Sequence, residues 1–346
     1  MNVHGSFTYN DIALSCEQWR LRLTEMMQTA DAWEKSHFQF MMQWLDEEET
    51  IVVQTSGSSG TPKMISIPKA AMQASACMTG QYLRCFENTR ALLVLPSSFI
   101  AGKMMLVRAM ELGWQLTAYE PVAAPLEKIS ESFDFAAFTP MQLARLTENQ
   151  FALLSRFGTV IVGGAAIPDG IRQSIAGCNG NLLETYGMAE TLSHIAMRPI
   201  SLNDEPFTTL PGVTVETDAA GRLRIRAPHI SNEIIETQDV VELNSETSFY
   251  YRGRYDRVIN SGGVKLFAEV IERKLSMLLD APYYIAALTD ETLGQRIVLY
   301  IESENEMAVG ELKEKMKWVL DKYEVPKEII VVTSIERTQT GKIKFK

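Results

Sequence analysis

Two lysine-bearing loops, near opposite ends of the sequence, contain residue types that suit phosphate binding. The first loop reads Thr-Ser-Gly-Ser-Ser-Gly-Thr-Pro-Lys from Thr55 to Lys63. Its glycines let backbone N–H groups face a ligand, its hydroxyls add donors and its lysine adds positive charge, which together favour a polyphosphate site. The second loop contains Gly341 and Lys342. A lone lysine in that position is ordinarily a solvated surface charge.

The first loop differs from the two commonest glycine-rich nucleotide motifs. A Walker A loop requires Gly-x4-Gly-Lys-Ser/Thr, and here Pro62 precedes the lysine. The loop also lacks the Gly-x-Gly-x-x-Gly pattern of dinucleotide-binding folds. The alternative is a flexible, solvated Ser/Gly turn. Pro62 and the strands expected on both sides make a merely flexible linker less favoured.

The elements around this loop predict an α/β layered domain. The first fifty residues carry helical periodicity in two runs, one from Ser15 to about Met27 and one from Trp33 to Leu45. Further helices are expected over 69–85 and 103–112. Strands alternate with these helices, a pattern typical of a layered sheet. The strands are expected over 51–55, 64–67, 91–95, 115–119, 133–138 and 159–162.

The pattern changes after residue 200. Short strands with glycine or Asp/Asn turns are expected over 213–217, 223–227, 240–244 and 249–251, as an antiparallel barrel or sheet. From residue 257 onward, strands and two helices (268–279 and 309–323) predict a small α+β domain.

The sequence from Thr55 to Lys63 resembles the phosphate-binding signature of the adenylate-forming superfamily, which includes acyl- and aryl-CoA synthetases, luciferases and peptide-synthetase adenylation domains. Other segments that resemble this superfamily follow in order along the chain. The resemblance implies a set of ATP- and AMP-binding residues: Thr55, Ser56, Gly57, Ser58, Ser59, Gly60, Thr61, Lys63, Gly163, Gly164, Ala165, Tyr186, Gly187, Asp239 and Arg254.

The resemblance also implies individual roles. Tyr186 would stack on adenine, and Glu190 would be catalytic by helping to bind Mg²⁺. Lys342 would be the catalytic lysine that bridges the carboxylate and the α-phosphate. Ala189 departs from the pattern, because the family usually has threonine there. The remaining roles are the domain hinge, assigned to Asp256, and the CoA site, assigned to Gly262, Gly263 and Lys265.

The fold implied by this resemblance has two domains. Residues 1–255 would form a large α/β domain with layered sheets, a small β-barrel-like part and the AMP and acyl sites. Its N-terminal subdomain would be shortened, since only about fifty residues precede the phosphate loop. Residues 256–346 would form a small, mobile α+β lid domain that rotates about Asp256 between the two half-reactions.

The acid substrate is indicated by two further segments that resemble o-succinylbenzoate–CoA ligases of menaquinone biosynthesis. Arg108 falls where these ligases carry an arginine suited to a second carboxylate, although a helix-borne arginine is often an exposed surface residue. His194 either lines the acyl site or is a packed polar residue beside a turn. The acyl-site residues implied are Phe99, which replaces the family's usual histidine, Gly102, Arg108, Ser193 and His194.

The composition agrees with an enzyme of small molecules. The 346 residues are 46% hydrophobic and 22% charged, with a net charge of −10, which argues against nucleic acid as a partner. Neither a signal peptide nor a transmembrane run is evident, and the four cysteines show no metal spacing, so we expect a cytoplasmic protein. Its expected substrates are a carboxylic acid, ATP with Mg²⁺, and CoA.

Three alternatives remain at this point. The protein could be another aryl- or acyl-CoA ligase, an adenylating enzyme that loads a carrier-protein thiol, or a non-catalytic nucleotide-binding relative. Ala189 and the short N-terminal region favour the last of these, and the presence of both Lys63 and Lys342 counts against it.

Overall fold

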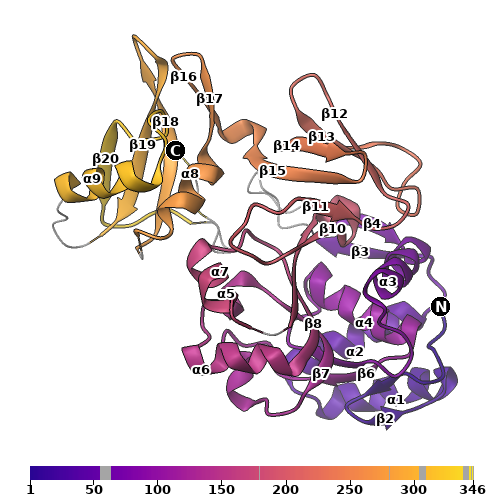
Figure 1. Cartoon of the computed structure of the whole chain (residues 1–346). Coiled ribbons are helices and arrows are strands. Elements are labelled where there is room, and N and C mark those ends of the chain that lie inside the picture. Colours follow the sequence, from indigo (N-terminus) through magenta and orange to yellow (C-terminus); the bar gives the residue numbers. More distant parts are fainter. Residues whose placement is uncertain are drawn as a thin grey trace. The chain divides into compact units, whose positions relative to one another are not determined.

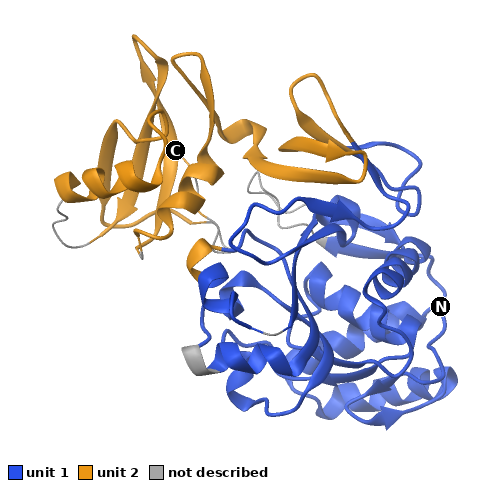
Figure 2. Cartoon of the chain, in the orientation of Figure 1, with its two compact units in different colours: residues 1–167, 171–215, 225–235 blue, residues 168–170, 216–224, 236–346 orange. Residues whose placement is uncertain are grey.

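The computed structural model describes residues 1–54, 64–178, 180–279, 281–303 and 309–337, with residues 343 and 345 (Figure 1). The chain forms two compact units (Figure 2). Unit 1 contains residues 1–167, 171–215 and 225–235, and unit 2 contains residues 168–170, 216–224 and 236–346. The division of the chain into domains 1–255 and 256–346, with a hinge at Asp256, stays a prediction.

Unit 1 is built on a largely parallel sheet, as its buried apolar strands predict. Neighbouring strands follow the order β11-β10-β9-β8-β7-β5-β6-β1-β2. The pairs from β6 to β9 are parallel, and β10 adds antiparallel to β9 at one side. The strands are β1 (Thr8–Tyr9), β2 (Ile12–Ala13), β5 (Arg90–Leu93), β6 (Gln115–Ala118), β7 (Phe133–Phe138), β8 (Phe157–Val162), β9 (Asn181–Gly187), β10 (His194–Pro199) and β11 (Phe207–Thr209).

Helices accompany this sheet, and α1 packs against α2 as α3 packs against α4. Helix α1 begins in a capping box, in which the Ser15 hydroxyl accepts from the Gln18 backbone and the Gln18 side chain accepts from the Ser15 backbone. The α-helices of unit 1 are α1 (Cys16–Thr29), α2 (Ala32–Leu45), α3 (Lys69–Leu83), α4 (Ile100–Leu112), α5 (Pro140–Leu143), α6 (Glu148–Phe151) and α7 (Asp169–Ile175). Short 3₁₀ turns are η1 (Pro125–Lys128), η2 (Ala152–Arg156) and η3 (Ala189–Thr191).

The N-terminal region contains the two expected helices and two short strands that the sequence did not predict. Strand β1 pairs parallel with β6, with Tyr9 opposite Leu116. Phe7 and Tyr9 are fully buried there. A two-residue strand has no periodicity to detect, so the signal for it comes only from its long-range partner.

A separate antiparallel pair, β3 (Thr50–Gln54) and β4 (Met64–Pro68), flanks the predicted phosphate loop. Gln54 pairs with Met64, so the residues on either side of the loop are neighbours. Residues 55–63 themselves lie outside the described residues, and so do Gly341 and Lys342.

Unit 2 contains β14 (Ile235–Ser245) except for Ile235, and the antiparallel partner of β14, which is β15 (Ser248–Arg254). It also contains residues 216–224, which include the end of β12 (Thr214–Thr217) and the start of β13 (Arg222–Arg226). The turn η4 (Tyr255–Arg257) leads from β15 into a five-stranded sheet. In that sheet β18 and β19 form a hairpin, and β20 adds parallel to β19. Its elements are β16 (Val258–Ser261), β17 (Val264–Phe267), α8 (Ala268–Leu275), β18 (Tyr283–Asp290), β19 (Gly294–Glu302), α9 (Val309–Val319) and β20 (Glu328–Val332).

The helices of unit 2 cover an apolar core. Ile271 and Leu275 of α8 and Met316 of α9 pack in one cluster with Leu299 and Ile301 of β19. This is the small α+β segment expected from the sequence. Among the described residues, no helix is both long and apolar enough to cross a membrane.

Buried His37 makes the stability of unit 1 dependent on pH. The Tyr9 hydroxyl lies 3.1 Å from His37 Nδ1, and burial lowers the pKa of His37 to about 4. The unfolded chain takes up a proton near the ordinary value of 6.5, before the folded protein does, so stability is lost as pH falls through this window. We expect the free energy of unfolding to drop by about 2 kcal/mol between pH 7 and pH 5 from His37 alone.

Urea unfolding at both pH values measures this loss, and a His37→Gln variant should show a shallower dependence. Histidine NMR on the folded protein gives an independent check. Titration of His37 near pH 6.5 would contradict the assignment even if the variant did not fold.

Candidate active site

The corner between β9 and β10 gathers five of the predicted site residues. Tyr186 and Gly187 end β9, Glu190 lies in η3, and Ser193 and His194 lead into β10. A Cβ at position 187 would collide with the Ser193 carbonyl and with His194 Cα. Glycine is therefore required for the two strands to approach this closely.

A strained γ-turn holds Ser193 and His194 in place. Leu192 has a φ of 62°, and the Ser193 N–H donates to the Thr191 carbonyl at 2.6 Å. Thr191, which is fully buried, accepts from the Met188 N–H at 2.8 Å. A non-glycine residue in this region costs of order 1–3 kcal/mol and persists only where its surroundings impose it. Thr191 was not predicted as a site residue, because a buried hydroxyl inside a turn leaves no periodic signal.

The strand-end glycines lie beside this corner. The Gly163 N–H donates to the Phe138 carbonyl at 3.2 Å, and a Cβ at 163 would collide with the Thr185 hydroxyl. Gly164 has a φ of 91°, which favours glycine, and Ala165 is exposed. The structure thus brings the 163–165 turn next to Thr185, one residue before Tyr186.

A buried carboxylate between two arginines fixes the position of β9. Glu184 Oε2 accepts from Arg172 and from Arg198, each at 2.6 Å, and all three side chains are buried. Arg198 also lies over the Phe207 ring, 4.3 Å from its centroid, and Phe207 contacts Tyr186 at 5.8 Å between ring centroids. The set connects α7, β9 and β10 directly beneath the predicted adenine-binding tyrosine. Glu184, Arg172 and Arg198 were not predicted as a set, because their spacing matches no motif.

The acyl-site residues come from α4 and from the β9–β10 corner. A Cβ on Gly102 would collide with the Pro96 carbonyl, so glycine lets the first turn of α4 pack against the chain that precedes it. Phe99 precedes the helix and is 55% exposed. The Arg108 guanidinium donates to the Ser193 hydroxyl at 2.6 Å and joins the helix to the corner.

Arg108 is a buried cation, and the surface alternative for it is wrong. It is 2% exposed, and among the described residues it has no carboxylate partner while its Nε has no hydrogen bond. Burial lowers the pKa of Arg108 to about 10, so it stays charged at neutral pH. A buried charge without a counter-ion is costly, and an anionic ligand would relieve that cost.

His194 is buried beside the turn, which agrees with the packed-residue alternative, and its place in the acyl site stays a prediction. Burial, followed by the positive charge of Arg108, holds the pKa of His194 well below its usual value. Its ring nitrogens lie 3.1 Å from the Thr79 hydroxyl and 3.4 Å from the Ser193 hydroxyl.

In unit 2, the predicted ribose and hinge residues share one guanidinium. Arg254 donates to both oxygens of Asp256, at 3.1 Å and 2.9 Å, and lies 3.9 Å from the largely buried carboxylate of Asp239. Hydrogen bonding to Arg254 lowers the pKa of Asp256. The structure thus places Asp239, Arg254 and Asp256 together at the end of the β14–β15 pair.

The predicted CoA residues lie on the β16–β17 hairpin of unit 2. Gly262 and Gly263 form its two-residue turn, with φ values of 59° and 83°, which a type I′ hairpin requires. Lys265 is exposed on β17. These three residues share one exposed hairpin.

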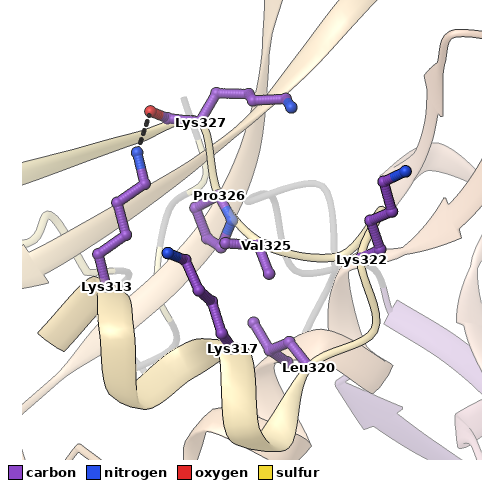
Figure 3. Close-up of a pocket in the computed structure, with 7 residues that line it drawn as sticks. All are labelled: Lys313, Lys317, Leu320, Lys322, Val325, Pro326 and Lys327. Carbon is purple, nitrogen blue, oxygen red and sulfur yellow. Dashed lines mark hydrogen bonds between the residues drawn. The ribbon is translucent and has the colours of Figure 1, made fainter.

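A hollow of about 450 Å³ lies elsewhere in unit 2 (Figure 3). None of the residues that line it is a predicted site residue. Its amines are partly engaged: Lys313 donates to the Lys327 carbonyl at 3.1 Å, and Lys317 pairs with Glu314 at 2.6 Å. The lining residues are Lys313, Lys317, Leu320, Lys322, Val325, Pro326 and Lys327.

Comparison with known proteins identifies the family. Residues 11–227, more than half of the chain, match the family described as AMP-binding enzyme. The chain belongs to this family. The resemblance to the adenylate-forming superfamily and the α/β fold class are thereby confirmed.

Several relatives and solved structures are similar to this AMP-binding enzyme. A crystal structure of an AMP-forming acyl-CoA synthetase/AMP-acid ligase II-like protein from Dyadobacter fermentans is 34% identical, with a TM-score of 0.64, and covers 94% of this chain and 96% of that one. A probable 2-succinylbenzoate–CoA ligase of Mycobacterium tuberculosis is 26% identical over 338 residues, covering 86% of this chain and 83% of the relative. The Bacillus subtilis o-succinylbenzoate CoA synthetase in complex with ATP and magnesium ion shares the fold at a TM-score of 0.75 and 18% identity, covering 94% of this chain and 80% of that one.

The buried carboxylate of Glu184 provides a stability prediction for this AMP-binding enzyme. A Glu184→Gln substitution removes the buried anion that Arg172 and Arg198 share, leaves Arg198 with Asp204 at 3.6 Å, and should reduce the free energy of unfolding by about 3–5 kcal/mol. The matched control is Glu25→Gln, which removes an exposed pair with Arg22 and should cost less than about 1 kcal/mol. Thermal and urea unfolding of both variants measure the difference. Equal, small losses in the two variants would show that the buried set does not hold β9.

Proposed function

We propose that this AMP-binding enzyme is an AMP-forming ligase that joins 2-succinylbenzoate to CoA. The observation that carries the choice of acid is Arg108, a buried cation without a carboxylate partner among the described residues, bonded to Ser193 beside the predicted nucleotide-binding corner. An acid with a second carboxylate would supply the missing anion. The names of the Mycobacterium tuberculosis relative and the Bacillus subtilis structure agree with this choice.

The proposed first half-reaction converts a poor leaving group into a good one. A carboxylate oxygen of the acid attacks the α-phosphorus of ATP, the bond to the β-phosphate oxygen breaks, and pyrophosphate leaves. Negative charge accumulates on the phosphates, so the protein contributes positioning and electrostatic stabilisation rather than a nucleophile. Ser56 to Lys63 would hold the β- and γ-phosphates, and Tyr186 would hold the adenine. Lys342 would bridge the carboxylate and the α-phosphate.

The predicted magnesium site fits the residues present. Glu190 is exposed at the β9–β10 corner, and the described residues form no group of three or more His, Cys, Asp or Glu that could enclose a metal. Mg²⁺ is commonly bound by one or two carboxylates together with substrate phosphates, so a single available carboxylate suits it. When bound, Mg²⁺ offsets phosphate charge.

The proposed second half-reaction forms the thioester. The CoA thiol loses its proton, its sulfur attacks the acyl carbon, the bond from that carbon to the phosphate oxygen breaks, and AMP leaves. Lys342 would have to leave the site to admit the thiol, which is why a mobile domain hinged at Asp256 is part of the proposal. Gly262, Gly263 and Lys265 would then line the CoA site. A cytoplasmic location supplies both ATP and CoA, and the four free cysteines suit a reducing compartment.

A thioester assay tests the function and the role of Arg108 together. The protein with 2-succinylbenzoate, ATP, Mg²⁺ and CoA should yield 2-succinylbenzoyl-CoA, identified by mass. Arg108→Met should raise the KM for this acid at least about tenfold and leave the KM for ATP unchanged, since a charge-assisted hydrogen bond is lost. The matched control is Lys103→Met on the same helix, whose ammonium lies over the Phe40 ring.

The outcomes separate the proposal from its rivals. Faster turnover of a monocarboxylic acid would indicate another acyl- or aryl-CoA ligase, and AMP release that needs a carrier protein in place of CoA would indicate a loading enzyme. The absence of pyrophosphate exchange with every acid would indicate a non-catalytic relative, for which Ala189 is the one specific argument.

Lys342 should matter for only one half-reaction. Lys342→Ala should reduce adenylation by several orders of magnitude, because the bridging charge is lost, and should spare thioester formation from a supplied acyl-adenylate. Pyrophosphate exchange measures the first step, and CoA-dependent AMP release measures the second. Equal loss of both steps would refute the divided role.

A further inference from the structure

A continuous series of hydrogen bonds runs from helix α3 to the buried cation on helix α4. The Thr79 hydroxyl donates to the Ser75 carbonyl at 3.0 Å and lies 3.1 Å from His194 Nε2. His194 Nδ1 lies 3.4 Å from the Ser193 hydroxyl, which accepts from Arg108 at 2.6 Å. Thr79 and His194 are both buried, so water does not replace these partners.

Counting protons gives this series a single direction. The Thr79 hydroxyl has one hydrogen, and the Ser75 carbonyl takes it, so Thr79 can only accept from His194. The proton of a neutral His194 then sits on Nε2, and Nδ1 is left as an acceptor for the Ser193 hydroxyl. The two hydroxyls and the imidazole N–H of the series then each have a partner.

The opposite direction satisfies fewer groups. If His194 carried its proton on Nδ1, the histidine and the arginine would both donate to the Ser193 oxygen. The hydroxyl hydrogen of Ser193, which is half-buried, would then have no acceptor among its described partners, and its bond to the imidazole would be lost. The low pKa of His194 agrees with a neutral ring, which is the form that has two tautomers.

We propose that Thr79 is a positioning residue for the acid substrate: it holds His194 in the Nε2-protonated tautomer, which leaves the Ser193 oxygen to accept from Arg108 without a competing donor. Arg108 then keeps one orientation, in which its buried Nε has no hydrogen bond and would be the donor for the second carboxylate of the acid. The part of this proposal that concerns the acid rests on the proposed function. The tautomer itself does not.

A back-bond to the carbonyl four residues earlier is a common use of threonine in helices, and by itself it needs no functional reason. The additional observation here is the imidazole nitrogen on the other side of the same hydroxyl. Thr29 provides the comparison, because its hydroxyl also donates to a carbonyl of its own helix, at 3.5 Å to Met26, and it is exposed.

Nitrogen NMR of the histidine-labelled protein tests the tautomer directly. The sequence has four histidines, so the His194 signals can be assigned by their loss in a His194→Gln variant. In the unsubstituted protein we expect the Nε2-protonated form. Thr79→Val removes the acceptor and should shift His194 towards the Nδ1-protonated form. Thr79→Ser should restore the original pattern, and Thr29→Val should leave it unchanged.

Kinetics test the consequence for the substrate. Thr79→Val should raise the KM for 2-succinylbenzoate about five- to tenfold, with kcat and the KM for ATP nearly constant, because only the acid meets Arg108. A purely structural role would lower the amount of active enzyme and leave every KM unchanged. Thr79→Ser should recover most of the affinity for the acid.

Failure of this proposal can be distinguished from failure of the proposed function. An Nδ1-protonated His194 in the unsubstituted protein overturns the role of Thr79, whatever acid is used. This measurement does not require Thr79→Val to fold. An Nε2-protonated His194 in a protein that does not use 2-succinylbenzoate supports the role of Thr79 and rejects the acid.

Discussion

The carboxylate of Glu184, buried between Arg172 and Arg198, is the interaction on which the arrangement of unit 1 depends. It anchors the middle of β9, where the parallel part of the sheet meets the antiparallel strand β10. Two residues later the strand delivers Tyr186, and immediately after that the chain turns back through the Leu192 γ-turn into β10. A shift of β9 by one residue would exchange the two faces of the strand and turn Tyr186 away from Phe207. Charge pairing thus sets the register, and the register sets the candidate site.

The same corner combines two kinds of buried charge with opposite requirements. The negative charge of Glu184 is balanced by Arg172 and Arg198. These two arginines also donate to the backbone carbonyls of Ile167 and Glu205. The partners of Arg108 among the described residues are the Ser193 hydroxyl and the more distant Met105 sulfur, and none of them is a carboxylate. The first set is suited to holding structure and the second to receiving an anion. Burial alone does not separate these roles, but the presence or absence of a partner does.

The sequence predicted the parts of this protein that have a local signature. Alternating apolar strands and periodic helices predicted the α/β class, and glycines such as Gly187 and Gly263 stand where the backbone requires them. The structure shows that His194 and Arg108 are both buried, which rejects an exposed Arg108. Strands β1 and β2 were missed, because two residues carry no period and the pairing of β1 with β6 is a contact between residues more than one hundred positions apart.

The polar groups that act through tertiary contacts were likewise beyond the sequence. Thr79 precedes His194 by 115 residues, and their separation of 3.1 Å depends on how α3 packs beside β10. In the sequence, Glu184 resembles an ordinary polar residue in a strand, because its two arginine partners are known only from the structure. The reason is the same for both residues: patterns in a single sequence report the periodicity of a residue and not the identity of its distant partner.

The close approach at Gly187 and the strained turn at Leu192 have a consequence for how this site can diversify. The backbone of the corner tolerates little exchange, because any side chain at 187 meets Ser193 and His194. Inserted or deleted residues would disturb the register that Glu184 maintains. Change in the preferred acid is therefore channelled into a few side chains on rigid supports, at positions 79, 108, 193 and 194. A directed library at those four positions would vary the surroundings of Arg108 while Tyr186, Gly187 and Glu190 of the corner stay unchanged.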